Sequence, residues 1–106
     1  MDSDEILKLK NDVVKAAKQI YEKGLVEAGE GNISSRIPEK NELLITPTFN
    51  KYYNLKESDI VHIRFDGTLI GEGEPSTEYK LHVAVYKSRP RANYVIHTHS
   101  PYATML

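Results

Sequence analysis

The chain has 106 residues, of which 40% are hydrophobic and 27% are charged, values typical of one soluble globular domain. Its 14 basic and 15 acidic residues give a net charge of -1 at pH 7. That balance excludes the strongly basic surface typical of proteins that bind nucleic acid or anionic membranes. The absence of cysteine excludes disulfides and cysteine-ligated zinc, so any metal site must use histidine, aspartate or glutamate.

The sequence also has no signal for membrane insertion or export. No apolar run approaches the roughly 18 residues that span a bilayer. Residues 1–5 are acidic, which is the wrong charge for a secretory or mitochondrial leader. We therefore expect a cytoplasmic protein that binds neither nucleic acid nor membranes.

The first half of the chain predicts one helix followed by short strands. Apolar residues at helical spacing predict an amphipathic helix over residues 3–23, which Gly24 ends. A glycine-rich polar loop then leads to short strands at 33–37 and 43–46, and partial alternation favours a strand over 59–65. The Asp66-Gly67 pair predicts a type I′ hairpin turn before a strand at 68–70.

The second half predicts a helix and then a strand. Ser76 is a favourable N-cap and predicts a helix over residues 77–88, which is apolar on most sides and is therefore expected to be buried. This helix ends before Pro90, because a residue that precedes proline avoids the helical conformation. A strand is predicted over 94–99, and Ser100-Pro101 is typical of the start of another helix.

Two histidines on the last predicted strand are candidate metal ligands. Side chains alternate between the faces of a strand, so His97 and His99 are expected to point the same way. Two imidazoles on one rigid strand supply half of a metal site. Two histidines on one face also occur in polar networks or facing solvent, and the pattern by itself leaves these alternatives open.

A carboxylate and three polar segments are further candidates. Glu78 falls in the first turn of the predicted buried helix, where it is either a general acid/base or a side chain that the helix dipole favours. The segments at 31–34, 46–48 and 76–77 are small and polar, and they can donate hydrogen bonds to a phosphate or form ordinary turns. His62 and His82 are interpreted as structural, although His82 lies one helical turn from Glu78.

Taken together, the motifs resemble the class II aldolase/adducin family over nearly the whole chain. Segments that recur in this family, in the same order, are Gly31-Asn-Ile-Ser-Ser-Arg36, Leu44-Ile-Thr-Pro-Thr48, Asp59-Ile-Val61, Pro75-Ser-Thr-Glu78, Leu81-His82, Arg89-Pro90 and Val95-Ile-His-Thr-His-Ser-Pro-Tyr-Ala-Thr104. The resemblance implies an α/β fold of the α+β type, in which a mixed, largely antiparallel sheet is flanked by helices in three layers.

The resemblance also implies a function. It implies a zinc-dependent aldolase that cleaves a ketose 1-phosphate, such as L-fuculose 1-phosphate, to dihydroxyacetone phosphate and an aldehyde. His97 and His99 match zinc ligands of the family, with one Zn²⁺ per subunit, and Glu78 matches its catalytic acid/base. The substrate phosphate would be held by Asn32, Thr48, Ser76 and Thr77, with Gly31 shaping the loop. Family members are homo-oligomers, usually cyclic tetramers with each active site at a subunit boundary.

Two departures from the family pattern modify these expectations. Phe49 stands where the family usually has a glycine that lets the backbone approach a phosphate. The third zinc histidine and a tyrosine-bearing tail of the family have no counterpart in residues 1–106. We therefore expect this chain to be a truncated N-terminal portion that forms one domain. We also expect it to bind metal weakly and to show little turnover. The alternatives are a sugar-phosphate 4-epimerase of the same family and a non-catalytic, adducin-like oligomerisation module.

Overall fold

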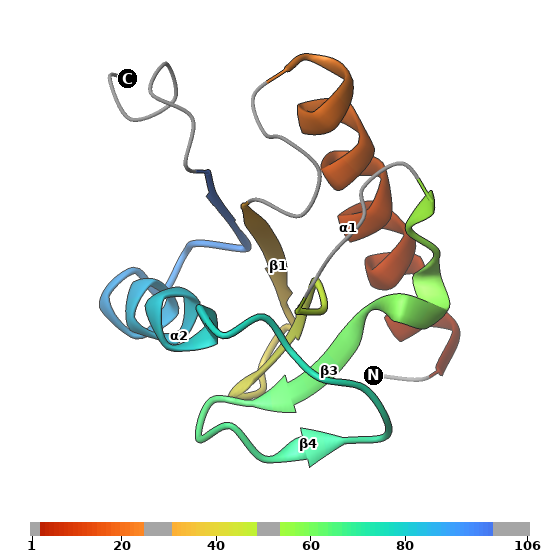
Figure 1. Cartoon of the computed structure of the whole chain (residues 1–106). Helices are drawn as coiled ribbons and strands as arrows, with labels where there is room; N and C mark the ends of the chain where they lie inside the picture. Colours follow the sequence, from red (N-terminus) through yellow and green to blue (C-terminus); the bar gives the residue numbers. More distant parts are fainter. Residues whose placement is uncertain (1–2, 25–30, 49–53, 99–106) are drawn as a thin grey trace.

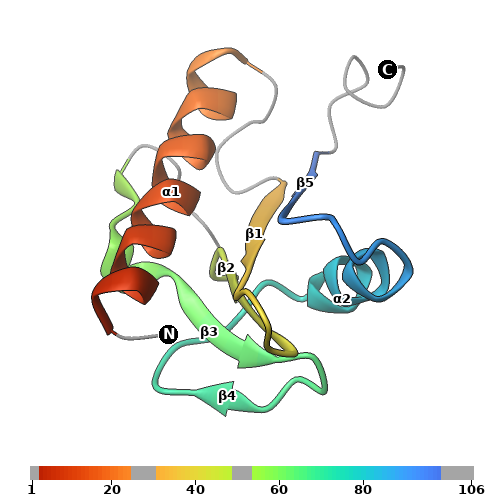
Figure 2. The same ribbon diagram turned by 180° about the vertical axis from the view of Figure 1, so that it is seen from behind.

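The computed structural model describes residues 3–24, 31–48 and 54–98, which form a five-stranded sheet between two helices (Figures 1 and 2). The strands lie in the order β4-β3-β2-β1-β5, and all four neighbouring pairs are antiparallel. The elements, in chain order, are α1 (Ser3–Glu22), β1 (Asn32–Arg36), β2 (Glu42–Ile45), the 3-10 helix η2 (Glu57–Asp59), β3 (Val61–Arg64), β4 (Leu69–Ile70), α2 (Tyr79–Ser88) and β5 (Tyr94–His97). The expected fold class, an antiparallel sheet flanked by helices, is confirmed.

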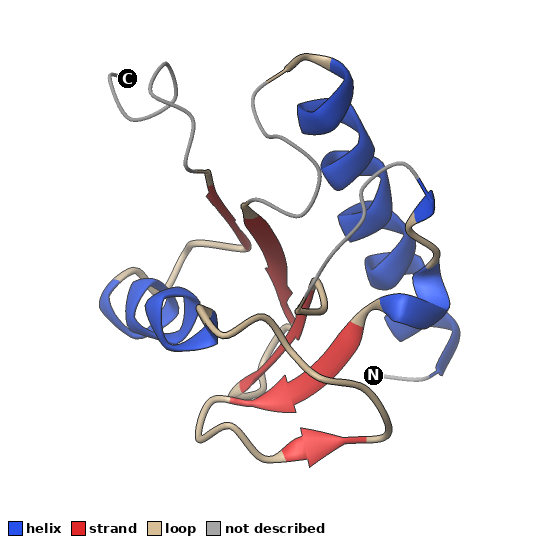
Figure 3. Ribbon diagram, in the orientation of Figure 1, coloured by secondary structure: helices blue, strands red, loops and turns tan. Residues whose placement is uncertain are grey.

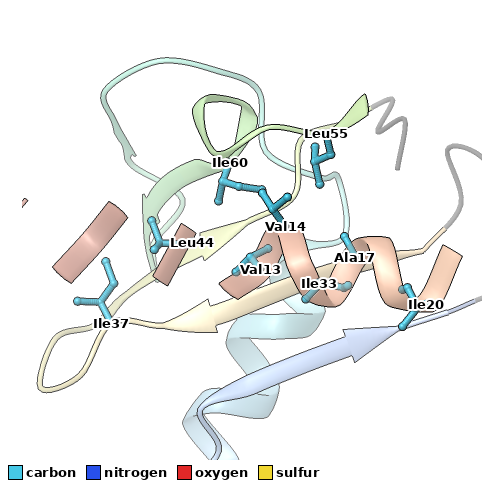
Figure 4. Packing of buried hydrophobic residues seen from close by; sticks show 9 residues of the cluster. All are labelled: Val13, Val14, Ala17, Ile20, Ile33, Ile37, Leu44, Leu55 and Ile60. Carbon is cyan, nitrogen blue, oxygen red and sulfur yellow. The ribbon is translucent and has the colours of Figure 1, made fainter. Parts of the chain in front are cut away.

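Helix α1 covers one face of the sheet, and an apolar core fills the space between them (Figures 3 and 4). The buried side chains of this core are Val13, Val14, Ala17, Ile20, Ile33, Ile37, Leu44, Leu55 and Ile60. The residues from α1 recur at the three- and four-residue spacing of one helix face, as the sequence pattern predicts. Removing this apolar surface from water is the main driving force for docking α1.

Helix α2 covers the opposite face and buries a second cluster, which consists of Leu43, Ile45, Val61, Ile63, Val83, Tyr86 and Val95. Neighbouring residues of β2 alternate between the two cores, since Leu43 faces α2 and Leu44 faces α1. Neither helix in the described part of the chain is long and apolar enough to cross a membrane.

The hairpin between β3 and β4 differs from the predicted type I′ turn. A type I′ turn needs positive φ at both central residues, but Gly67 (φ 92°) has positive φ and Asp66 does not. The Gly67 N–H donates to the Arg64 carbonyl at 2.9 Å, and the Arg64 N–H donates to the Thr68 carbonyl at 2.9 Å. The Asp66 carboxylate also accepts the Thr68 N–H at 2.9 Å, which stabilises this wider turn.

Two further expectations about local structure are wrong in detail. The predicted strand at 59–65 begins only at Val61, because the 3-10 helix η2 occupies residues 57–59. Helix α2 is not buried on most sides: its buried residues are His82, Val83 and Tyr86, whereas Leu81 is 42% exposed. The helix therefore presents one face to the sheet and the other to solvent.

Substitution of Leu44 by alanine tests the core beneath α1. Leu44 is fully buried, so Leu44→Ala should lower the free energy of unfolding by about 2–5 kcal/mol through lost burial and the cavity left behind. Leu7→Ala is the matched control, because Leu7 lies on α1 but is 46% exposed, and its loss should stay within about 0.5 kcal/mol. Urea denaturation of both variants makes the comparison, and equal losses would contradict this packing.

Candidate active site

Backbone hydrogen bonds bring the three polar segments of the sequence together at one end of the sheet. The Thr46 N–H donates to the Ile33 carbonyl at 3.0 Å, and the Thr46 hydroxyl accepts the Ile33 N–H at 3.2 Å. The Ser76 N–H donates to the Thr46 carbonyl, and the Thr48 N–H donates to the Glu74 carbonyl, both at 3.0 Å. The segments at 31–34, 46–48 and 76–77 are thus neighbours in space although they are far apart in the sequence.

The end of β5 lies beside the start of β1 and brings a histidine to the same place. Asn32 is the register partner of His97 in the antiparallel pair of β1 and β5. The His97 ring nitrogen Nε2 lies 3.1 Å from the Glu78 carboxylate oxygen Oε2. Their side chains are 31% and 37% exposed, so solutes in water can reach both. The structure therefore places a candidate metal ligand next to the candidate acid/base.

Glu78 lies just before α2 and not in its first turn, which corrects the sequence expectation. The helix begins at Tyr79, and Glu78 is its N-cap residue. The Ser76 hydroxyl accepts the Glu78 N–H at 3.2 Å, and the Ser76 carbonyl accepts the Tyr79 N–H at 3.1 Å. These bonds form a turn at 76–79, so Ser76 caps this turn while the helix starts two residues later than predicted.

Below this site, His82 is fully buried in a network of polar side chains. Its Nε2 is hydrogen-bonded to the Asn32 amide oxygen, and its Nδ1 lies 2.7 Å from the Ser34 hydroxyl. The Ser34 hydroxyl also lies 2.6 Å from the Tyr86 hydroxyl. Burial, reinforced by the nearby His97, lowers the pKa of His82 to about 4, and burial raises the pKa of Tyr86 to about 12. Both groups are therefore neutral at pH 7.

The interpretation of His62 and His82 as structural agrees with these contacts, but sequence reasoning missed the partners of His82. Its bonds go to β1, while His62 bonds to Glu42 at 2.8 Å near α1. The sequence does contain one signal that could have pointed to a polar network, namely the four-residue spacing of Glu78, His82 and Tyr86. That spacing is typical of residues on one helix face.

Other predicted site residues divide into those the structure describes and those it does not. His99 and Phe49 lie outside the described residues. Strand β5 ends at His97, so the expectation that His97 and His99 share a face stays a prediction. Gly31 has φ 78°, a conformation that favours glycine and explains this residue type in the loop. Among the described side chains, no three potential metal ligands form a group.

The chain is similar in sequence to a protein family and to several sugar-phosphate enzymes. A family model described as the class II aldolase and adducin N-terminal domain matches residues 11–106. The chain is 37% identical over 97 residues to 5-deoxy-D-ribulose 1-phosphate aldolase of Bacillus thuringiensis, covering 91% of this chain and 46% of that protein. It is 35% identical over 97 residues to L-fuculose phosphate aldolase of Methanocaldococcus jannaschii, covering 92% of this chain and 52% of that protein.

A relative named for a different activity is 3-oxo-tetronate 4-phosphate decarboxylase of Haemophilus influenzae. It is 34% identical over 94 residues, which cover 89% of this chain and 44% of that protein. A solved L-fuculose 1-phosphate aldolase matches with a TM-score of 0.84 and 34% identity, covering 100% of this chain and 49% of that one. A putative aldolase/epimerase/decarboxylase from Klebsiella pneumoniae matches with a TM-score of 0.85 and 28% identity, covering 94% and 48%. The chain spans about half the length of the curated relatives it matches.

The lowered pKa of His82 predicts a loss of stability in mild acid. The ring takes up a proton near pH 6.5 in the unfolded chain but only near pH 4 in the folded chain. As the pH falls, the unfolded state binds this proton first. The stability that the neutral His82 ring contributes to the folded state is therefore fully present above pH 6.5 and is lost as the pH falls toward 4. This pKa difference corresponds to a loss of about 3 kcal/mol in the free energy of unfolding.

Urea denaturation of the wild type and of His82→Gln across this pH range measures the effect. The wild type should lose more stability than the variant, which has no titrating group at this position. An equal pH dependence of the two proteins would contradict the lowered pKa.

Proposed function

Since the chain belongs to the class II aldolase and adducin family, we propose that it carries the metal-binding, proton-transfer and phosphate-binding groups of a zinc-dependent sugar-phosphate aldolase. The observation that carries this proposal is the 3.1 Å contact between Glu78 and His97. The contact lies where the three phosphate-compatible segments meet. A metal ligand, an acid/base and hydrogen-bond donors are therefore within reach of one small substrate.

The donor types at this place fit a zinc ion. Neutral imidazole and carboxylate are ligands that zinc accepts, and catalytic sites use three protein ligands and one open position. His97 and His99 would hold the ion, and Glu78 would be a further ligand when substrate is absent. A bound zinc would act as a Lewis acid on the hydroxyl and carbonyl oxygens of the substrate.

Glu78 would move the proton in the reaction. In retro-aldol cleavage the Glu78 carboxylate would accept the proton of a substrate hydroxyl as the neighbouring carbon–carbon bond breaks, which yields an aldehyde and the enediolate of dihydroxyacetone phosphate. The Glu78 carboxyl group would then donate a proton to the enediolate carbon. Its place before α2, on a turn held by the Ser76 hydroxyl and carbonyl, keeps the carboxylate oriented toward His97.

The phosphate would bind where the loops converge. Asn32 contributes a side-chain amide, and Thr48, Ser76 and Thr77 contribute hydroxyl groups. Backbone N–H groups near the start of α2 add the positive end of the helix dipole. Gly31 shapes the loop that carries Asn32. Binding energy from the phosphate, which does not react, would orient the carbon–carbon bond at the other end of the substrate.

The substrate class that we propose is a ketose 1-phosphate, such as L-fuculose 1-phosphate or a 5-deoxypentulose 1-phosphate, which the names of the aldolase relatives suggest. A second candidate is decarboxylation of a 3-oxo sugar acid phosphate, which the Haemophilus relative suggests. Either reaction leaves a carbanion-type product that Glu78 would protonate. Release of carbon dioxide rather than an aldehyde distinguishes the two.

The remaining expectations stay predictions of this proposal. They are a homo-oligomeric assembly and a cytoplasmic location. A 4-epimerase would recombine the two fragments after cleavage, so it would interconvert two sugar phosphates without net release of aldehyde. A non-catalytic module would bind no zinc at His97.

Zinc titration by calorimetry tests the metal site. Loss of a group that only supports a metal ligand weakens metal binding ~10- to 100-fold. His97→Ala removes a ligand itself, so it should weaken zinc binding by more than this. His99→Ala should have a similar effect. His62→Ala is the matched control, since His62 bonds to Glu42 near α1, and it should bind zinc like the wild type. Equal affinities in all four proteins would refute the metal site.

Glu78→Gln tests proton transfer separately from metal binding. With zinc present, the wild type should catalyse exchange of solvent deuterium into dihydroxyacetone phosphate, which requires deprotonation at carbon but no carbon–carbon cleavage. The variant should lose ~10²- to 10⁴-fold in exchange rate, the usual contribution of a general acid/base. Glu72→Gln is the control, because Glu72 is an exposed carboxylate of the preceding loop. An unchanged rate in Glu78→Gln would remove Glu78 from the mechanism.

A further inference from the structure

Four polar side chains form a continuous buried chain of hydrogen bonds between α2 and β1. In order, they are Tyr86, Ser34, His82 and Asn32, and each is at most 4% exposed. The Tyr86–Ser34 and Ser34–His82 bonds measure 2.6 and 2.7 Å. The chain ends at Asn32, which lies opposite His97 at the candidate active site.

With the Asn32 amide oxygen facing His82, the donors and acceptors in this chain have one order. The Asn32 amide oxygen is only an acceptor, so the Nε2 of His82 carries the ring proton. A neutral imidazole has one N–H, so its Nδ1 accepts the Ser34 hydroxyl proton. The Ser34 oxygen then accepts from the Tyr86 hydroxyl. The shifted pKa values of His82 and Tyr86 preserve this order between about pH 5 and pH 9, because neither group changes charge there.

This order also fixes which side of the Asn32 amide is available for other partners. In this order the Nε2–H of His82 holds the amide oxygen, and a flipped amide would require the Nδ1–H tautomer of His82. The bond to His82 uses the amide oxygen of Asn32 and leaves the amide nitrogen on the other side of the group. The group that Asn32 offers to a ligand is therefore an NH₂ donor, which suits an oxyanion and not a cation.

We propose that His82, supported by Ser34 and Tyr86, is a positioning residue that holds the amide of Asn32 with its NH₂ group available to the phosphate oxygens of the substrate. This inference rests on the proposed function in assigning Asn32 to the phosphate site. His82 itself touches no substrate, because it is fully buried beneath Asn32. Its contribution is to select a hydrogen-bond acceptor, such as a phosphoryl group, as the ligand of Asn32.

The tautomer of His82 tests the order of hydrogen bonds without any ligand. In the full 106-residue chain labelled with ¹⁵N, a long-range ¹H–¹⁵N spectrum of the imidazole rings identifies the protonated nitrogen. We expect the Nε2–H form of His82, unchanged from pH 6 to pH 8. The Nδ1–H form would reverse the order and overturn the inference.

A pair of amide variants tests the effect on binding, with inorganic phosphate as the probe. In His82→Gln the amide nitrogen takes the place of Nε2 and can still donate to Asn32. In His82→Asn the shorter amide takes the place of Nδ1, so it reaches Ser34 but not Asn32. We expect the phosphate Kd to rise at least ~10-fold in His82→Asn, equivalent to about 1.4 kcal/mol, and to stay near the wild-type value in His82→Gln.

Controls separate positioning from folding. His62→Gln and His62→Asn repeat both substitutions at a histidine that bonds to Glu42 near α1, and neither should alter phosphate binding. Should both His82 variants fail to fold, Ser34→Ala removes the donor to Nδ1 with a smaller change, and it should weaken phosphate binding while the chain stays folded.

The outcomes distinguish this inference from the proposed function. Equal phosphate affinity in the wild type, His82→Gln and His82→Asn would overturn the positioning role and leave the proposed function intact. The same conclusion would follow if both His82 variants fail to fold and a folded Ser34→Ala binds phosphate as tightly as the wild type. Failure of the wild type to bind phosphate, with the Nε2–H tautomer observed, would overturn the phosphate site and with it the role of His82. Normal phosphate binding in His82→Gln with weakened binding in His82→Asn would support both the positioning role and the phosphate site.

Discussion

Hydrogen bonds between buried polar side chains of β1 and α2 determine how the two elements dock. Asn32, Ser34 and Arg36 alternate along the face of β1 that meets α2. His82 and Tyr86 project from the helix to meet them, and the Arg36 guanidinium bonds to the Tyr86 carbonyl and lies 4.9 Å from the centre of its ring. A shift along either element would leave buried groups unpaired, at a cost of about 1–3 kcal/mol each.

This docking also determines the position of Glu78, the N-cap residue of α2, which precedes His82 by four residues. Once His82 is held between Asn32 and Ser34, the end of α2 has little freedom, and Glu78 is held beside His97. The contact between α1 and the sheet differs in kind, because the side chains that it buries are apolar. The hydrogen bonds that set the site geometry therefore lie on the face of the sheet that α2 covers, while both faces bury apolar cores.

The loops of the candidate phosphate site are held by backbone contacts rather than by side chains alone. Thr46 links β1 to the segment before α2, since it bonds both to Ile33 and to Ser76. Pro47 and Pro75 form an isolated bridge beside this link. Donors on such a frame are preorganised, so the proposed binding of a phosphate would cost little ordering of the chain. The buried network under Asn32 extends this preorganisation to a side chain.

The sequence by itself determined the order of the elements, the face of α1 that is buried, and the candidate residues Glu78 and His97, because these depend on short-range periodicity and recurring motifs. It did not determine the hairpin at Gly67, where the Asp66 carboxylate captures the Thr68 N–H and stabilises a wider turn. Nor did it reveal the partners of His82, which lie 48 and 50 residues away in the chain. Only the tertiary structure decided these pairings, because a buried hydrogen bond between distant residues exists only after both elements have docked on the sheet.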